Sequence, residues 1–259
     1  MASGPPPSCE RTLMDIFAIP PLTLLLDAAY SALLSLSGVL DPVASSASAA
    51  LAVMLVTIGV RAALIPVGIS QARAEQLRAR LAPRLRALQQ RHGKDRERLQ
   101  RETMALYRDE QTSPLAGCLP LIVQAAVVGV LYTLFLRPEI AGHPNALLAH
   151  DLLGAPLGDS LIAAVGSGLN GQTAAVWAVV LVVIVVVADV TRRVFRPQVP
   201  ADGPLAAAGM LGVMNTMHYL TAVFAVFVPL AAALYLVVTV TWTLGQRWAL
   251  RRRYPLPDA

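Results

Sequence analysis

The sequence predicts an all-α membrane protein with five transmembrane helices, an N-terminal interfacial helix and a cytoplasmic helical hairpin. Of its 259 residues, 56% are hydrophobic and 14% charged, against roughly 25% charged in an ordinary soluble domain. The apolar residues gather in long runs, five of which have the length and apolarity of spanning helices. These runs are residues 50–69, 115–136, 172–190, 205–226 and 227–246.

The segment before the first span divides into a tail and an apolar stretch. Residues 1–11 are Pro-rich and polar, without a signal peptide, and we predict that residues 1–20 form a disordered tail. Met14 is an alternative start. Residues 21–40 are apolar but contain Asp27 and three serines, so we interpret them as an amphipathic helix lying in the membrane interface. The alternative is a sixth spanning helix, because the length suffices.

The distribution of basic residues predicts the orientation of the five spans. Residues 70–114 hold eleven Lys or Arg, the link 191–204 holds three, and the basic tail 247–259 holds four. By the positive-inside rule these three regions are cytoplasmic. Residues 137–171 contain one arginine and three acidic residues and are rich in Gly, Pro and Ala, which is typical of an extracytoplasmic loop. The N-terminus is therefore expected outside and the C-terminus in the cytoplasm.

The predicted cytoplasmic hairpin, residues 70–114, begins with an amphipathic helix and carries a net charge of +5 from eleven basic and six acidic residues. Apolar residues of the first helix recur at spacings of four, four and three: Leu77, Leu81, Leu85 and Leu88. The pair His92-Gly93 ends this helix, and a second runs from Lys94 to about Asp109. Positive-inside topology accounts for most of the charge. A further interpretation is attraction to anionic lipid headgroups or ribosomal RNA.

Arg61 is the most informative residue, because it lies inside an apolar span with no other charge. A guanidinium at bilayer depth costs about 2.5–3.5 kcal/mol on insertion scales and usually marks function. It lies roughly 12 Å from the cytoplasmic end of its helix. Three other spans carry polar residues at similar depth, namely Gln124, Asn215 and Thr239. We therefore predict that these four residues line a wet pocket open to the cytoplasm, although each polar residue taken alone is as well explained by hydrogen bonding between helices.

The neighbours of Arg61 define the expected limits of this pocket. On its own helix only Thr57 is polar on the outer side, so the polar layer should thin out above Arg61. On the last span one helical stripe continues the layer: Tyr235, Thr239, Trp242 and Gln246. Asp189 lies at the end of the third span, where we expect it to pair with Arg192. Arg61 is thus predicted to have no buried carboxylate and to rely on polar neighbours and water.

Several chemistries have no support in the sequence. Cys9 and Cys118 lie far apart, and the four histidines lack metal-ligand spacing. There is no Gly-rich phosphate loop or nucleophile elbow. We expect no metal, no cofactor and no covalent catalysis, so the protein is not expected to be an enzyme.

From Leu81 the chain reads LAPRLRALQQRHGKDRERLQRETMALY, followed by SPLAGCLPLIVQ ending at Gln124. These runs resemble the YidC-type membrane protein insertases of bacteria. Arg61 matches the arginine in the first core span of that family, and the resemblance covers about residues 50–246. In the last span Pro229 and Leu234-Tyr235 match, whereas residues 230–232 depart from the family's Ala-Gly-Leu. The sequence contains no large extracytoplasmic domain. In this it resembles the short, Gram-positive-like members of the family, which also lack one.

The resemblance implies a chaperone-like insertase in the bacterial inner (plasma) membrane, with a hydrophilic groove closed to the outside. Its partners would be nascent membrane proteins, the ribosome, the Sec translocon and anionic lipids, with no nucleotide and no DNA. Arg61 would hold the acidic or polar segment of the substrate. Two other classes remain as alternatives. One is a small-solute or ion transporter, for which the chain lacks the usual internal repeat, and the other is a non-catalytic membrane scaffold.

Overall fold

The computed structural model describes residues 20–110, 125, 129–130, 133–135, 139–140, 143–195 and 216–255. Its long elements are helices: α1 (Pro20–Ala44), α2 (Ser48–Ala63), α3 (Ile65–His92), α4 (Arg96–Asp109), α7 (Gly171–Val194), α9 (Leu220–Phe227) and α10 (Leu230–Arg253). The predicted all-α class agrees with this architecture. Among the described residues, two stretches are long and apolar enough to cross a membrane, Leu26–Ala63 and Gly171–Val194, and Met217–Phe227 is a shorter apolar helix.

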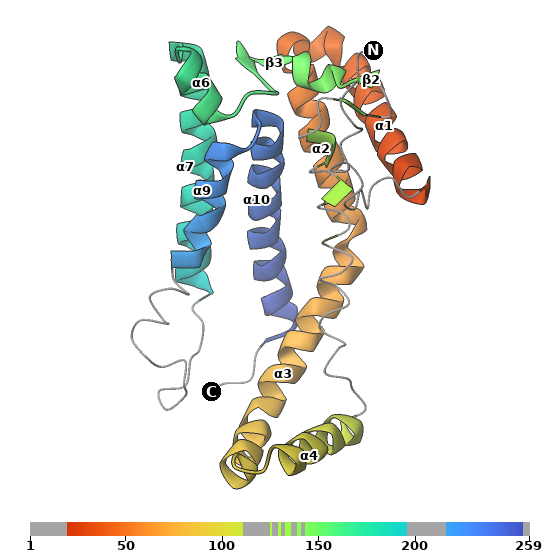
Figure 1. Ribbon diagram of the computed structural model, residues 1–259, viewed down its shortest axis with the longest axis vertical. Coiled ribbons are helices and arrows are strands. Elements are labelled where there is room, and N and C mark those ends of the chain that lie inside the picture. The colour runs from red at the N-terminus through yellow and green to blue at the C-terminus, as the bar shows by residue number, and fades with distance from the viewer. Residues whose placement is uncertain are drawn as a thin grey trace, which may run out of the picture.

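Helix α10 lies between α2 and α7 and packs against both (Figure 1). Its first six residues, from Leu230 to Tyr235, are all buried, and three of them are alanines. Small side chains let neighbouring helix backbones approach closely. Trp177 and Ile184 of α7 and Val53 of α2 are each 1% exposed and belong to the same core. The core of the bundle is therefore built around the first half of α10.

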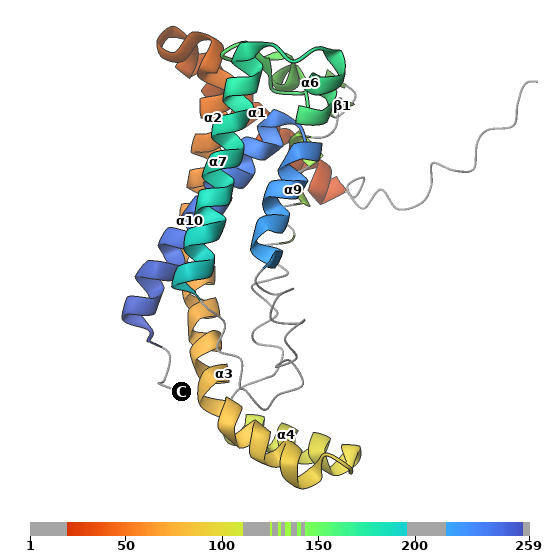
Figure 2. The same cartoon turned by 90° about the vertical axis from the view of Figure 1, so that its left-hand side faces the viewer.

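Helix α1 folds back on α2 through a single 3-10 turn, η3 (Ser45–Ala47), where Ser45 has a φ of 43°. Leu33 of α1 is fully buried against this neighbour, and the Ser37 hydroxyl donates to the Ser48 hydroxyl at 3.4 Å. The helix predicted over 21–40 thus exists but is longer, and it packs on the bundle (Figure 2). Whether it lies in the interface or spans stays a prediction.

The helical path that carries the first predicted span continues past Ile69. Helix α2 ends at Ala63, and α3 begins at Ile65 with Pro66 in its first turn. Proline lacks an N–H donor and clashes with the preceding turn, but it is tolerated at the start of a helix. Hydrogen bonds from Leu64 N to Val60 O (3.0 Å) and from Gly68 N to Leu64 O (3.1 Å) keep the backbone nearly continuous. The helical path therefore runs on from Arg61 into α3 as far as His92.

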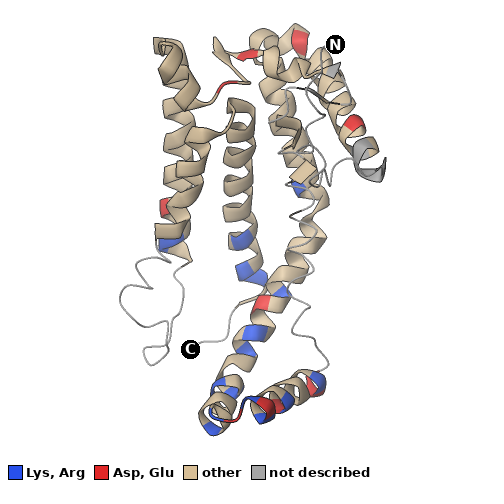
Figure 3. Ribbon diagram, viewed as in Figure 1, with Lys and Arg blue, Asp and Glu red and all other residues tan. Residues whose placement is uncertain are grey.

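At one end of the molecule α4 returns against α3, and Lys and Arg gather on these helices and on the last turns of α7 and α10 (Figure 3). We call this the basic end. Helix α3 ends at His92, as the pair His92-Gly93 predicts, and Asp95 caps α4 by accepting from Arg98 N at 3.0 Å. The last helix was predicted to end at Gln246, but α10 continues to Arg253, so most of the predicted basic tail is helical.

The opposite end is covered by residues 143–170, which we call the cap. Predicted as a loop, this segment contains β2 (His143–Pro144), which pairs with β1 (Glu139–Ile140), and also η4 (Ala146–Ala149), β3 (Asp151–Leu152), β4 (Ala155–Pro156) and α6 (Leu161–Ser167). Pro229 separates α9 from α10, as the sequence suggests. The N–H groups of Leu230 and Ala231 donate to the cap carbonyls of Asp159 (2.9 Å) and Leu157 (3.0 Å). The cap thereby satisfies donors that a helix start leaves open.

Candidate functional site

A cavity of about 270 Å³ lies beside Arg61, between the α2–α3 junction and the second half of α10. We call it the Arg61 cavity. Thirteen residues line it: Arg61, Leu64, Val67, Gly68, Gln71, Ala72, Glu75, Thr243, Gln246, Arg247, Leu250, Arg251 and Tyr254. Their charges are three arginines against one glutamate, a formal net charge of +2. The cavity therefore favours anionic or polar groups.

On α2, no residue above Arg61 lines the cavity. The Thr57 side chain is 1% exposed, and its hydroxyl donates to Val53 O within the same helix at 2.7 Å. A hydroxyl bonded to its own helix offers little to a ligand. The residues around it on α2 are apolar, and the described lining of the cavity runs from Arg61 toward the basic end.

Of the four predicted site residues, the structure describes Arg61 and Thr239, whereas Gln124 and Asn215 lie outside the described residues. Arg61 lines the cavity, but Thr239 does not. Thr243, one turn further along α10, takes its place. Within the described part of the chain, the buried hydroxyls of Thr239 and Tyr235 have no hydrogen-bond partner. The predicted stripe on α10 is therefore polar at its buried end, and of its four residues only Gln246 lines the cavity.

The Gln246 side chain connects the stripe to the cavity. Trp242 Nε1 donates to Gln246 Oε1 at 3.0 Å, and the Gln246 amide lies directly over Gly68 of α3. No side chain at position 68 separates the helices there, so α3 and α10 approach closely beside Arg61. A Cβ atom at Gly68 would overlap the Gln246 amide nitrogen.

One carboxylate lies near Arg61 but is not buried, since the Glu75 side chain is 46% exposed. Glu75 lines the same cavity and forms an ion pair with Arg251, at 3.5 Å between Glu75 Oε1 and Arg251 Nη2. The sequence reading missed Glu75 because it ended the span at Ile69. Continuing the helical spacing of three and four from Arg61 gives Leu64, Gly68, Ala72 and Glu75, and this signal would have found it.

The end of the cavity is held by contacts between α3, α7 and α10. Arg247 and Arg251 lie over the Phe195 ring at 5.5 and 4.6 Å from its centroid. Arg73 Nη2 donates to the Tyr254 hydroxyl at 3.3 Å, and this hydrogen bond lowers the pKa of Tyr254 from its ordinary value. These contacts fix the orientation of the last turn of α10 beside the cavity.

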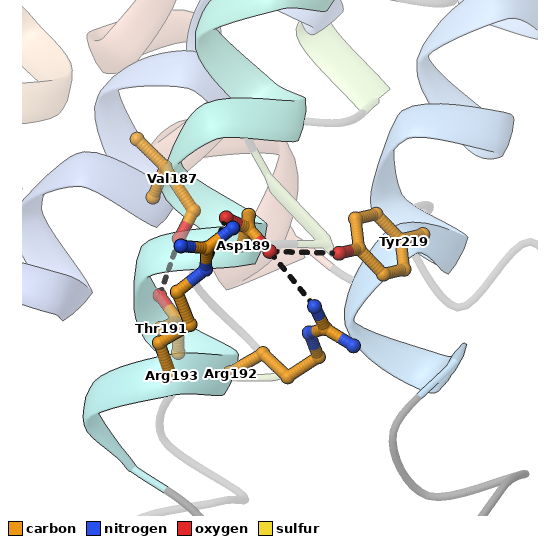
Figure 4. Close-up of polar contacts among 6 residues, drawn as sticks. All are labelled: Val187, Asp189, Thr191, Arg192, Arg193 and Tyr219. Atoms are coloured by element: carbon orange, nitrogen blue, oxygen red, sulfur yellow. Dashed lines mark hydrogen bonds and ion pairs between the residues drawn. The ribbon is translucent and has the colours of Figure 1, made fainter.

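Asp189 lies outside the Arg61 cavity and joins α7 to α9. The carboxylate accepts from Arg192 Nη2 at 3.0 Å and Arg193 Nε at 2.7 Å, which confirms the predicted pairing with Arg192 (Figure 4). The Tyr219 hydroxyl, from the turn η6 (Met217–Tyr219), donates to the same carboxylate at 3.2 Å. This cluster is therefore a link between helices, and it carries its own neutralising charges.

Fold and site together define a helical protein with long apolar helices and an electropositive cavity lined by Arg61 and two further arginines. The family model described as 60Kd inner membrane protein matches residues 41–257. The chain belongs to this family.

Curated relatives agree with this assignment and with the resemblance to insertases. The chain is 39% identical over 114 residues to the membrane protein insertase YidC of Alkalihalophilus pseudofirmus, covering 40% of this chain and 45% of that protein. It is 37% identical over 102 residues to the YidC of Laribacter hongkongensis, covering 39% and 18%. It is 28% identical over 202 residues to the YidC of Methylobacillus flagellatus, covering 78% and 32%. The matches span less than half the length of each relative. They do not favour a transporter or a scaffold.

Proposed function

We propose that this protein is a membrane protein insertase of the bacterial inner membrane, acting without covalent chemistry on nascent membrane proteins. The observation that carries the proposal is the Arg61 cavity, with its formal net charge of +2 between α2, α3 and α10. An arginine at this depth is costly to retain unless it serves a function. Family membership supplies the functional context.

In this mechanism Arg61 attracts the acidic or polar segment that precedes or follows a substrate's transmembrane helix. A guanidinium offers charge-assisted hydrogen bonds to carboxylates, and its attraction is stronger at bilayer depth than in bulk water. Holding the polar segment part-way into the membrane shortens the apolar distance left to cross. The substrate's apolar helix then moves into lipid, driven by removal of its surface from water.

The same proposal includes the finer topology. Five spans with the N-terminus outside and the C-terminus in the cytoplasm place the basic end at the cytoplasmic surface. There α3 and α4 would meet anionic lipid headgroups, the ribosome or the Sec translocon. Gln124 and Asn215 would add polar groups to the groove, and the buried hydroxyl of Thr239 would bind water or substrate at its inner end. This last role is supported by the cost of a buried hydroxyl without a partner.

The test is insertion into proteoliposomes that contain only this protein. A single-span substrate with an acidic N-terminal segment is synthesised in their presence, and protease protection measures its insertion. We expect Arg61→Ala to lower insertion several-fold and Arg61→Lys to retain much of it, because positive charge is the requirement. Arg80→Ala, which removes an exposed charge of α3 outside the cavity, is the matched control.

Two outcomes would count against the proposal at different levels. Insertion no greater than into empty liposomes would exclude an autonomous insertase. Equal loss in Arg61→Ala and Arg61→Lys would mean that guanidinium geometry, rather than charge, is needed. A photocrosslinking residue at position 124 should also capture ribosome-bound nascent chains, and its failure to do so would remove Gln124 from the groove.

A further inference from the structure

Arg247 and Arg251 form an oriented pair of cations at the far end of the Arg61 cavity. They lie one turn apart on α10, and the ring of Phe195, which is 6% exposed, lies under both guanidinium groups. Stacking on an aromatic face reduces the freedom of an arginine side chain while leaving its N–H donors available. Both arginines line the cavity. Their positions therefore favour a ligand with a carboxylate.

Glu75 already supplies one carboxylate to this pair. Its ion pair with Arg251 spans 3.5 Å, and the side chains are 46% and 34% exposed, respectively. Ion pairs this exposed contribute little to stability and are screened by salt. Another carboxylate can therefore replace Glu75 at Arg251 without a large energetic cost.

The two cationic positions are separated along one nearly continuous helix. Glu75, the ion-pair partner of Arg251, lies 14 residues after Arg61. At 1.5 Å per residue the helix rise between these two backbone positions is about 21 Å. An extended polypeptide covers that distance in about six residues, at roughly 3.3 Å per residue.

We propose that Arg247 and Arg251 are a second contact for the acidic segment whose first contact is Arg61. Glu75 occupies Arg251 until a substrate carboxylate replaces it. The substrates served best carry two acidic residues about six residues apart in an extended segment, the one nearer the transmembrane helix reaching Arg61. This inference rests on the proposed function and adds the spacing of acidic residues to the definition of the substrate.

The test uses two substrates in the proteoliposome assay described above. One has acidic residues six positions apart, and the other keeps only the acidic residue nearer its transmembrane helix. We expect the double variant Arg247→Gln/Arg251→Gln to lower insertion of the first substrate about threefold, the scale of a partly exposed ion pair. Insertion of the second substrate should fall much less, because it has no carboxylate that reaches this pair. Glu75→Gln should raise insertion of the first.

Controls separate the contact from the fold. Arg252→Gln makes the same charge change on α10 but affects a residue that stacks on Trp248 outside the cavity, so both substrates should insert normally. Phe195→Leu keeps apolar volume while removing the stacking face, and it should affect only the two-acid substrate.

Equal loss for both substrates in the double variant would overturn the second contact. If a substrate with acidic residues three positions apart inserted as well as the one with six, the predicted spacing would be wrong. If Glu75→Gln lowered insertion, a substrate carboxylate would not replace Glu75 at Arg251. These results are distinct from failure of the proposed function, which would appear as no insertion of either substrate by the unaltered protein.

Discussion

Gly68 is the residue that brings α3 and α10 into contact beside Arg61. The Gln246 amide occupies the space where a side chain at position 68 would lie, and Gln246 also accepts from Trp242. Gln246 is long and flexible, so an added methyl group should displace its amide instead of separating the helices. Position 68 therefore controls the shape of the cavity more than the stability of the fold.

We expect Gly68→Ala and Gly59→Ala to differ in their effect on stability, although both replace a helical glycine. At Gly59 no atom lies within 4 Å of the added Cβ, so the substitution should stabilise by roughly 0.5–1 kcal/mol through reduced backbone entropy. At Gly68 that gain should be offset by loss of the Trp242–Gln246 hydrogen bond, about 1 kcal/mol. Thermal unfolding of both variants in detergent measures the difference. Equal stabilisation would show that Gln246 moves without loss.

Tyr254 offers a pH-dependent probe of the end of α10. Its pKa is lowered because Arg73 donates to the phenol oxygen, so Arg73→Gln should raise the pKa toward 10. The folded pKa is below the unfolded one, so the associated stabilisation is present above the unfolded pKa and lost as the pH falls through the folded pKa. Near neutral pH this stabilisation is absent. Absorbance at 295 nm, taken as the difference from Tyr254→Phe, follows the titration. An unchanged curve would mean that Arg73 does not contact Tyr254 in solution.

Arg61 could be chosen from sequence because a charge in an apolar span is conspicuous whatever its neighbours are. Its neighbours were harder to predict. Depth counted from predicted span ends placed Thr239 in the cavity, but α10 extends to Arg253 and the cavity is offset by one turn to Thr243. Such offsets depend on how two helices slide along each other, which is a tertiary property that no single helix encodes.

At the scale of elements, helix starts were predictable where a local signal exists. Pro229 ends α9 and precedes α10, and Asp95 caps α4. The junction between α2 and α3 was not predictable in this way. Hydropathy changes sharply there, but Pro66 lies in the first turn of α3 and permits a nearly continuous helix. Hydropathy reports where a helix meets water, and it does not report where the helix ends.

The Asp95 cap gives a test of the pair α3 and α4. Asp95→Ala removes the acceptor for Arg98 N and should destabilise α4 by about 1 kcal/mol. Asp95→Asn keeps an acceptor and should have little effect. Amide hydrogen exchange along α4 should accelerate in the first variant only. Faster exchange in both would indicate that the negative charge, rather than the hydrogen bond, stabilises the helix start.

At the scale of the whole molecule, the cap joins elements that are distant in sequence. Asn145, 5% exposed, donates from Nδ2 to Leu134 O at 2.7 Å and accepts from Leu147 N at 3.2 Å. Tyr30 of α1 accepts from Ala146 N at 2.9 Å. Thr173 of α7 donates to Gly154 O at 3.3 Å. Composition alone predicted a loop here, because these contacts are long-range and use backbone groups that leave no sequence pattern.

Asn145→Ala should therefore destabilise the bundle as a whole. It leaves the buried Leu134 carbonyl and Leu147 N–H without their present partner, a cost of about 1–3 kcal/mol. Ser167→Ala is the matched control, since that hydroxyl bonds only within α6, to Ala164 O at 3.2 Å, and its loss should change stability by no more than about 0.5 kcal/mol. Helical circular dichroism on heating in detergent measures both. If Asn145→Ala unfolds at the same temperature as Ser167→Ala, the cap contributes little to the stability of the bundle. If it unfolds earlier, the cap contributes to holding α1, α7 and α10 together at the end remote from Arg61.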